Sequence, residues 1–317
     1  IHDYRKWNKI KSTYIDGFLN AVSSATGCIH TSFFQLGTDT GRFASRNPNL
    51  QNMPRKDNDP IGIRNFLIPN EGHIFIDFDF SQIELRVGSW YCRDTKMLET
   101  YKNDGDIHAQ TTSVIYNIPF DEAINKNAPH YKERRSIAKN CNFGVFYGLF
   151  PNGLMRNLKK AGIEKTKQEC TDIIENLKNG YPKLAEWQKN TKQDASNCGY
   201  SETAFGRRRI LKGIHSPDIG MRSYWQRCSL NTPIQGTAAD ILKLAMVRML
   251  SKLEKHPYIK PLLTIHDEIL FEVPIDKADE ACTVIKECME TQPFDEFDVP
   301  LKAEGAKGCS FGNMEEL

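Results

Sequence analysis

The chain has 317 residues, of which 39% are hydrophobic and 26% are charged, and its formal net charge is +2. This length suits two lobes of roughly 100 to 200 residues each, and the composition excludes a disordered or fibrous chain. The longest uncharged stretch, residues 17–38, carries Ser, Thr, Asn, His and Gln side chains that hydrocarbon would not accept, so no membrane role is expected.

The placement of charges and cysteines narrows the function further. Residues 126–167 contain ten Lys or Arg against two acids, whereas residues 264–304 contain twelve acids against three Lys. Such asymmetry is typical of a protein that binds a polyanion or metal ions, with two solvated faces as the alternative. The nine cysteines form no CxxC pair, which argues against structural zinc and disulfides and predicts the cytoplasm or another reducing compartment.

A strand is predicted over residues 73–80. Its side chains alternate between two faces, one with Ile74, Ile76, Phe78 and Phe80 and the other with Phe75, Asp77 and Asp79. The following residues, from Ser81 to Glu84, have the form of a capping box, so a helix is expected to start at Ser81. Asp79 then lies at a strand-to-helix junction.

A basic helix is predicted over residues 132–150. Arg135, Lys139, Phe143 and Tyr147 are spaced four apart, so they follow one face of that helix. Two cations and two aromatic rings on one stripe suit the phosphates and the base of a nucleotide. The alternative is a solvated first turn that leads into an aromatic core contact.

Two further elements are predicted toward the C-terminus. Thr232 offers an N-cap and Pro233 a proline at the first helical position, so a helix is expected to begin there. Two β-rich runs within residues 262–273 flank Asp267 and Glu268, which predicts a hairpin with acids at its tip. Helices and antiparallel strands without a regular βαβ alternation indicate an α+β fold.

The acids of the strand and of the hairpin could meet on one sheet. Residue chemistry leaves Asp77 and Asp79 equivalent, because both point to the same face. Mg²⁺ favours carboxylate oxygens and takes its remaining ligands from water and substrate phosphates. Two such ions about 3.5 to 4 Å apart would suit phosphoryl transfer. The alternative is that these residues are solvated turn acids.

These segments resemble the motifs of the family A DNA polymerases, in the family's order and over nearly the whole chain. The catalytic and nucleotide-binding motifs are matched by Asp79-Phe80-Ser81-Gln82-Ile83-Glu84-Leu85-Arg86, Arg135-x3-Lys139-x3-Phe143-Gly144-x2-Tyr147-Gly148 and His266-Asp267-Glu268. Further matches are Thr40-Gly41-Arg42, Pro48-Asn49-Leu50-Gln51-Asn52, Asp106-Ile107-His108 and Asn231-x-Pro233-Ile234-Gln235-Gly236-Thr237-Ala238-Ala239-Asp240.

The resemblance implies a right-hand polymerase fold, with an antiparallel-sheet palm, mostly helical fingers and a thumb that is largely missing. The implied domains are the end of the thumb and entry to the palm at 1–30, the first part of the palm at 31–100, the fingers at 101–225 and the second part of the palm at 226–317. Because the chain starts at Ile1 rather than Met, it is expected to be a piece of a parent protein that holds a thumb or exonuclease region.

For the catalytic centre, the resemblance implies Asp79 and Asp267 as ligands of two Mg²⁺ ions, with Mn²⁺ as a substitute ion. The backbone carbonyl of Phe80 would be a further ligand. Glu268 would be a nearby acid of lesser importance, and Lys139 would aid the leaving pyrophosphate.

The incoming dNTP would be bound by residues from several motifs: Gln82, Glu84, His108, Arg135, Lys139, Phe143 and Tyr147. Arg135 and Lys139 would hold the β and γ phosphates, with His108 assisting. Phe143 and Tyr147 would support the nascent base pair. Glu84 would fill the space beside the sugar C2′ and so select deoxynucleotides.

The resemblance also implies residues that contact DNA: Arg42, Arg227, Asn231, Gln235 and His266. The first four would read duplex shape through minor-groove acceptors that are common to all base pairs, and His266 would lie beside the primer terminus. The expected partners are primer-template DNA and dNTPs, bound by a monomer.

The implied function is a template-directed DNA polymerase of replication or repair, which adds deoxynucleotides to a primer 3′-hydroxyl and releases pyrophosphate. The alternatives are a non-catalytic fragment that binds primer-template and a single-subunit RNA polymerase, against which Glu84 and Phe143 argue. Some positions depart from the family pattern, among them Phe311, which lies near where the family usually has Trp. Phe80 replaces a usual Tyr, and Asp77 is an unusual acid two residues before Asp79.

Overall fold

The computed structural model describes residues 2–54, 59 and 61–317. The chain forms two compact units, and each is described by itself. Unit 1 comprises Ile1–Ser81, Ala239–Thr291 and Lys302–Leu317, and unit 2 comprises Gln82–Ala238 and Gln292–Leu301. Helices combined with antiparallel sheets confirm the predicted α+β class.

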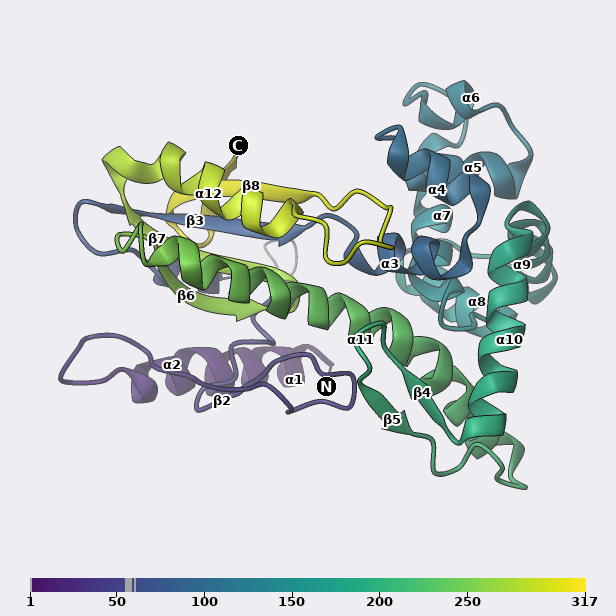
Figure 1. The fold of residues 1–317 in the computed structure, drawn as a ribbon, viewed down its shortest axis with the longest axis horizontal. Helices are drawn as coiled ribbons and strands as arrows, with labels where there is room; N and C mark the ends of the chain where they lie inside the picture. Colours follow the sequence, from purple (N-terminus) through teal and green to yellow (C-terminus); the bar gives the residue numbers. More distant parts are fainter. Residues whose placement is uncertain (1, 55–58, 60) are drawn as a thin grey trace. The chain divides into compact units, whose positions relative to one another are not determined.

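Unit 1 is built on a five-stranded antiparallel sheet in the order β6-β7-β3-β8-β9 (Figure 1). Its strands are β3 (His73–Phe80), β6 (Lys260–Ile265), β7 (Glu268–Pro274), β8 (Ala303–Ser310) and β9 (Asn313–Glu316). The predicted strand and the predicted hairpin are therefore confirmed. Only Asp267 of the two acids lies in the hairpin turn, because Glu268 is the first residue of β7.

Helices and a short hairpin complete unit 1. They are α1 (His2–Lys9), the π-helical η1 (Ile10–Ile15), α2 (Asp16–Ala21), β1 (Ser32–Phe34), β2 (Ala44–Arg46), η3 (Ile63–Phe66), η4 (Ile275–Lys277) and α12 (Ala278–Glu290). Ile10, Tyr14 and Phe18 form one buried cluster with Phe75 of β3 and Leu270 of β7. The face of β3 that carries the two aspartates is therefore anchored by an apolar core at its other end.

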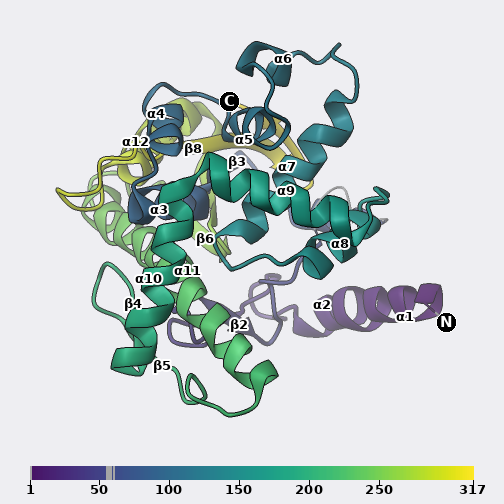
Figure 2. The same cartoon turned by 90° about the vertical axis from the view of Figure 1, so that its right-hand side faces the viewer.

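Unit 2 is mainly helical. It contains α3 (Ile83–Cys92), α4 (Thr95–Lys102), α5 (Ile107–Tyr116), α6 (Phe120–Ile124), α7 (Tyr131–Val145), α8 (Pro151–Lys160), α9 (Lys167–Gly180), α10 (Pro182–Cys198) and the hairpin of β4 (Tyr200–Glu202) and β5 (Arg208–Ile210). The helix α5 packs against α4, α6, α7 and α9, so it is the central helix of this unit (Figure 2).

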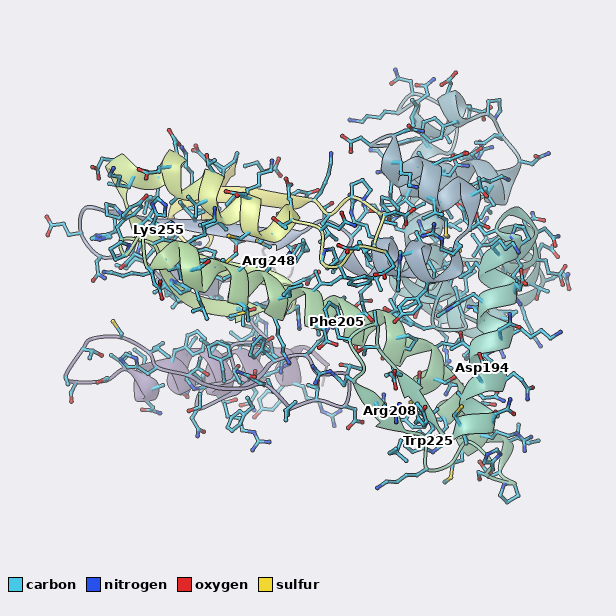
Figure 3. The ribbon with its side chains drawn as sticks, viewed as in Figure 1. Asp194, Phe205, Arg208, Trp225, Arg248 and Lys255 are labelled. Carbon is cyan, nitrogen blue, oxygen red and sulfur yellow. The ribbon has the colours of Figure 1, made fainter. Side chains whose placement is uncertain are left out.

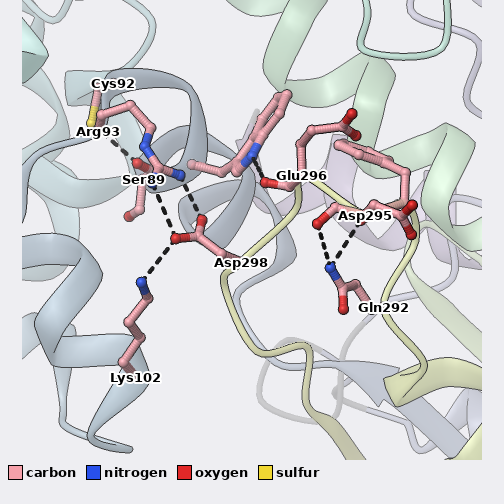
Figure 4. A network of polar contacts seen from close by, with 10 residues as sticks. Ser89, Cys92, Arg93, Lys102, Gln292, Asp295, Glu296 and Asp298 are labelled. Atoms are coloured by element: carbon pink, nitrogen blue, oxygen red, sulfur yellow. Dashed lines mark hydrogen bonds and ion pairs between the residues drawn. The ribbon is translucent and has the colours of Figure 1, made fainter.

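A short return of the chain, Gln292–Leu301, also belongs to unit 2. Asp298 accepts two hydrogen bonds from Arg93, at 2.5 and 3.0 Å, and one from Lys102 at 2.8 Å (Figure 4). Phe297, the residue before Asp298, is buried. Ion pairs and an apolar anchor together attach the return to the helices.

Two predicted helix ends differ from the structure. The helix α3 begins at Ile83, and its N-cap Gln82 has a left-handed backbone with no side-chain cap. A capping box requires an N-cap in the extended region and an acid three residues later, and Glu84 is only two residues after Gln82. The predicted helix over residues 132–150 ends at Val145, so Tyr147 lies in the following turn.

The helix predicted to begin at Thr232 was placed too late. The observed helix α11 (Ile219–Leu253) contains Pro233 in its interior and contributes residues to both units. A proline cannot donate to the carbonyl four residues earlier, which here is that of Ser229. The Ser201 hydroxyl of β4 donates to this carbonyl instead, at 2.9 Å, so the helix continues through the proline.

In the part of the chain that the structure describes, no helix combines the length and the apolar character needed to cross a membrane.

Candidate active site

The carboxylates of unit 1 gather where β3 ends beside the β6–β7 hairpin. Asp79 of β3 is paired directly with Glu268 of β7 in the antiparallel register. The amide of Phe80 donates to the carbonyl of Asp267 at 3.3 Å, which ties the hairpin turn to the end of β3. His266, the other turn residue, takes the left-handed backbone that a tight turn requires, with φ of 57°.

Gln51 fixes this hairpin from a loop more than 200 residues earlier. Its side-chain nitrogen donates to the carbonyl of Thr264, and its side-chain oxygen accepts from the amide of His266 at 3.0 Å. Gln51 is buried, so both bonds are shielded from water. The side-chain amide of Gln51 therefore binds both the strand β6 and the hairpin turn, and in this way it sets the position of Asp267.

A cavity of about 240 Å³ opens at this point. Its lining includes Arg64, Asp79, His266, Asp267 and Glu268. The guanidinium of Arg64 lies 3.2 Å from Glu268, with only 13% and 15% of the two side chains exposed. A pair this well shielded is costly to break, since removing either partner would leave a buried charge.

Asp77 lies in a separate cavity of about 310 Å³, which Asp59, Arg64 and Phe311 also line. Burial raises the pKa of Asp77 to about 9, with the nearby charges of Glu268 and Asp79 acting in the same direction. Its Oδ1 atom is buried with no hydrogen-bond partner in the described residues. Burial therefore favours the protonated form of Asp77, whereas Asp79 lines the cavity that contains Asp267.

The donor atoms at the hairpin fit a divalent cation. Asp79 and Asp267 supply carboxylate oxygens at one sheet edge, and the carbonyl of Phe80 follows directly in the chain. Mg²⁺ is usually bound by one or two carboxylates together with substrate phosphates, so two aspartates suffice while the third acid of the cavity, Glu268, is paired with Arg64. The cavity is therefore suited to hard cations in the presence of a phosphate-bearing substrate.

The predicted nucleotide residues lie in unit 2. Arg135 of α7 forms an ion pair of 2.6 Å with Asp106, the residue that caps the start of α5 through the amides of His108 and Ala109. Burial alone would raise the pKa of Asp106, but the bonds from Arg135 and the two amides outweigh it and leave the pKa lowered. Asp106 thus orients Arg135.

Lys139 and Phe143 project from the same helix as Arg135. Both side chains are exposed, and Phe143 is 67% exposed. An exposed aromatic ring on a helix gives up apolar burial, which favours a stacking role over the alternative of a core contact. The predicted stripe therefore exists as far as Phe143 and ends before Tyr147.

His108 lies at one end of a chain of buried polar groups. Asn142 donates to His108 Nδ1 at 2.8 Å, and the Asn142 oxygen accepts from Thr111 at 2.9 Å. Thr111 in turn lies 3.0 Å from the hydroxyl of Tyr181. Burial lowers the pKa of His108 to about 4, and Arg135 lowers it further against the opposing effect of Asp106. With Nδ1 as an acceptor, the proton is assigned to Nε2.

Glu84 is the meeting point of three segments of unit 2. The Tyr147 hydroxyl donates to Glu84 Oε2, and the Gln235 amide lies 3.4 Å from Glu84 Oε1. Both oxygens are therefore engaged by side chains rather than by a helix cap. Gln82, the N-cap residue of the same helix α3, accepts a hydrogen bond from the hydroxyl of Tyr101 at 3.1 Å.

The predicted DNA contacts are distributed over both units. Arg227 and Asn231 are half-buried on α11, and Gln235 follows one turn later on that helix. Arg42 lies in the loop between β1 and β2, which Lys243 anchors by donating to the carbonyl of Gly41 at 2.6 Å.

Five residues that support these positions were not singled out for such a role from the sequence: Gln51, Arg64, Thr111, Asn142 and Tyr181. Gln51 stood within a recognised motif, and this was the only signal that pointed to it. The others act through hydrogen bonds or ion pairs between distant segments, which no local periodicity indicates.

An α+β fold with carboxylates at the end of one strand and the neighbouring hairpin turn, together with a cationic helix, is the arrangement expected of a polymerase domain. The structure matches that of the POL domain of Pol1 from M. smegmatis in complex with DNA primer-template and dNTP, with a TM-score of 0.85 and 33% identity. The match covers 97% of this chain and 52% of that chain.

The sequence comparisons agree. The family model for DNA polymerase family A matches residues 1–313. DNA polymerase I of Caldicellulosiruptor bescii is 38% identical over 98% of the chain and 35% of its own length, and that of Borreliella burgdorferi is 39% identical over 98% and 33%. The chain belongs to DNA polymerase family A, and it spans about a third of the length of these relatives.

Proposed function

We propose that this chain is the catalytic part of a template-directed DNA polymerase, which adds deoxynucleotides to a primer 3′-hydroxyl and releases pyrophosphate. One observation carries the proposal: Asp79 and Asp267 line one cavity where β3 ends beside the β6–β7 turn, held by backbone pairing and by Gln51. Family membership supports this assignment. Primer-template DNA and dNTPs are the proposed partners of a monomer in a reducing compartment.

Asp79, Asp267 and the carbonyl of Phe80 would hold two Mg²⁺ ions, or Mn²⁺ in their place. Bound there, such ions make the primer hydroxyl more acidic and offset the charge of the leaving pyrophosphate. Glu268, paired with Arg64 at 3.2 Å, lies in the same cavity as the two aspartates. The protein contributes a rigid edge from which the two aspartates project.

The residues of unit 2 would bind the triphosphate. Arg135, oriented by Asp106, presents a guanidinium suited to phosphate oxygens, and exposed Lys139 adds a second cation. His108 is neutral with a proton on Nε2, so it can donate a hydrogen bond to an oxyanion without changing its charge. Phe143 would support the nascent base pair by stacking.

Primer extension by the 317-residue chain tests this proposal. Asp79→Asn and Asp267→Asn should each lower Mg²⁺-dependent extension by more than about 100-fold, since even indirect metal partners matter 10- to 100-fold. Binding of labelled primer-template should be retained. Asp276→Asn, at an exposed acid elsewhere in unit 1, is the matched control and should leave extension unchanged.

The outcomes separate the alternatives. Wild-type-like extension by either aspartate variant would contradict the metal assignment. Binding of primer-template without any extension by the unaltered chain, at low salt, would favour a non-catalytic fragment. Preferential use of rNTPs over dNTPs would favour an RNA polymerase.

A further inference from the structure

A further, cationic cavity lies within unit 2 and is lined by residues of α9, α10 and α11. Its volume is about 380 Å³, and no part of the family motifs lines it. The side chains that matter here are Lys178, Lys189, Lys192, Gln193, Ser196 and Gln226. Three positive charges and three neutral hydrogen-bonding groups therefore face one space.

No acidic residue appears in the lining of this cavity within the described part of the chain. Asp194, labelled on α10 in Figure 3, is exposed and does not line it. Other lysines of unit 2 are paired, for example Lys183 with Glu186 at 2.8 Å. By contrast, the cavity lysines form no ion pair with the residues that the structure describes.

The arrangement costs electrostatic energy unless an anion is bound. Lys189 and Lys192 are three positions apart on α10 and so lie on one helix face, where like charges repel. Burial lowers the pKa of Lys192, and the charges of Lys178 and Arg227 lower it further. A phosphate oxyanion would reverse this repulsion, and the side-chain amide of Gln226 would supply a further hydrogen bond.

We propose that this cavity binds backbone phosphates of the single-stranded template that extends beyond the primer-template duplex. The inference rests on the proposed function, because Arg227, whose charge reaches Lys192, is one of the residues assigned to the duplex. Arg227 directly follows Gln226 of the cavity lining on α11, so a strand bound at Arg227 would lie close to the cavity lysines. The lysine ammonium is a point charge, without the planar fork by which arginine forms bidentate bonds. Lysines therefore suit contacts with DNA backbone phosphates, which position a strand without reading its sequence.

Equilibrium binding without nucleotide addition tests the proposal. Two labelled DNAs are compared, a blunt duplex and the same duplex with a template overhang of about ten nucleotides, over a series of salt concentrations. The variant Lys178→Gln/Lys192→Gln should raise the Kd for the overhang DNA about tenfold and leave that for the blunt duplex unchanged. The slope of log K against log salt should fall by about 1.4, because each phosphate contact on a single strand contributes about 0.7.

A matched control removes the same charge elsewhere in unit 2. Lys160→Gln/Lys167→Gln, at exposed positions on α8 and α9, should bind both DNAs like the unaltered chain. The charge reversal Lys189→Glu should weaken overhang binding more than Lys160→Glu does. Because Lys189 is exposed, this variant keeps the test valid even if the half-buried Lys192 is needed for folding.

Three results would overturn the inference. One is equal binding of overhang DNA by the cavity and control variants, and another is an equal loss for blunt and overhang DNA. The third is calorimetric binding of tripolyphosphate that depends on the cavity lysines while overhang binding does not, which would assign the site to a free oligophosphate. Since binding is measured without catalysis, these results leave the Asp79 and Asp267 tests untouched.

Discussion

At the residue scale, Glu84 and Tyr147 act as a hydrogen-bonded pair. The Tyr147 hydroxyl donates to the Glu84 carboxylate, so it fixes the group proposed to exclude a ribose 2′-hydroxyl. Tyr147→Phe should raise ribonucleotide incorporation about tenfold, because one hydrogen bond to a charged group is worth roughly 1.5 to 3 kcal/mol. Glu84→Ala should raise it more. Competitive extension with mixed dNTP and rNTP measures both effects.

The double variant provides the control for this pair. If Tyr147 acts through Glu84, then adding Tyr147→Phe to Glu84→Ala should change selectivity no further. Additive effects of the two substitutions would show that Tyr147 contacts the nucleotide independently.

His108 links the site to pH-dependent stability. Its pKa is about 4 in the folded protein against 6.5 ordinarily, so the unfolded chain binds the extra proton between these values. Stability is therefore full above pH 6.5 and falls as the pH drops toward 4, by up to roughly 3 kcal/mol from this residue. His108→Gln, whose side-chain oxygen can accept from Asn142, should flatten the dependence. Urea unfolding at several pH values would measure it, and parallel curves for both proteins would contradict it.

At the residue scale, the sequence predicted which side chains form the candidate site, but not the hydrogen-bond and ion-pair partners that orient them. The spacing of Arg135, Lys139 and Phe143 follows from the helical period, and their alignment on α7 was anticipated. Asp106, which orients Arg135, and Asn142, which sets the tautomer of His108, act through side-chain geometry that a sequence pattern does not contain. The choice between Asp77 and Asp79 likewise depends on which cavity each one lines.

At the scale of helices and strands, the limits of an element were predicted well where they follow from sequence periodicity. They were predicted poorly where they depend on a tertiary contact. The strand β3 alternates with period two over eight residues, so its limits were anticipated. The start of α11 was misplaced because Pro233 normally marks a first helical turn. The compensation comes from Ser201, more than 30 residues earlier, and it has no local signal.

This compensation can be tested directly. Ser201→Ala should leave the buried Ser229 carbonyl without a donor and lower the free energy of unfolding by about 1 to 3 kcal/mol. In a Pro233→Ala background, the new amide of residue 233 can bond to Ser229, so Ser201→Ala should cost much less. Urea unfolding of all four proteins forms the cycle. An equal cost in both backgrounds would show that Ser201 stabilises the fold in another way.

At the scale of the whole molecule, charge follows the division into units. The basic residues 126–167 lie within unit 2, and most of the acidic residues 264–304 lie within unit 1. The asymmetry was anticipated from the sequence. The return of Gln292–Leu301 to unit 2 was not, because its attachment depends on Arg93 and on the ring of Trp90, whose nitrogen donates to the Glu296 carbonyl at 2.8 Å.

The attachment of residues 292–301 to unit 2 depends on the carboxylate of Asp298, which has two cationic partners, Arg93 and Lys102. The hydrogen bonds from Arg93, opposed in part by burial and aided by Lys102, lower the pKa of Asp298. Asp298→Asn removes both ion pairs, each worth roughly 0.2 to 1 kcal/mol at a partly exposed site. We expect local opening of residues 292–301 to become easier by about 1 kcal/mol, which corresponds to an amide hydrogen exchange about fivefold faster.

Hydrogen exchange with mass spectrometry measures this opening peptide by peptide. Asp295→Asn, in the same segment but with no ion pair among the described residues, should leave the exchange of residues 292–301 unchanged. High salt should narrow the difference between the unaltered chain and Asp298→Asn, since partly exposed pairs are screened. Acidification should do the same, because a lowered pKa means that the stabilisation is present above the ordinary pKa of 3.8 and is lost as the pH falls below it. Equal exchange in both variants would instead assign the attachment to the apolar contacts of Phe297 and Trp90, which salt does not weaken.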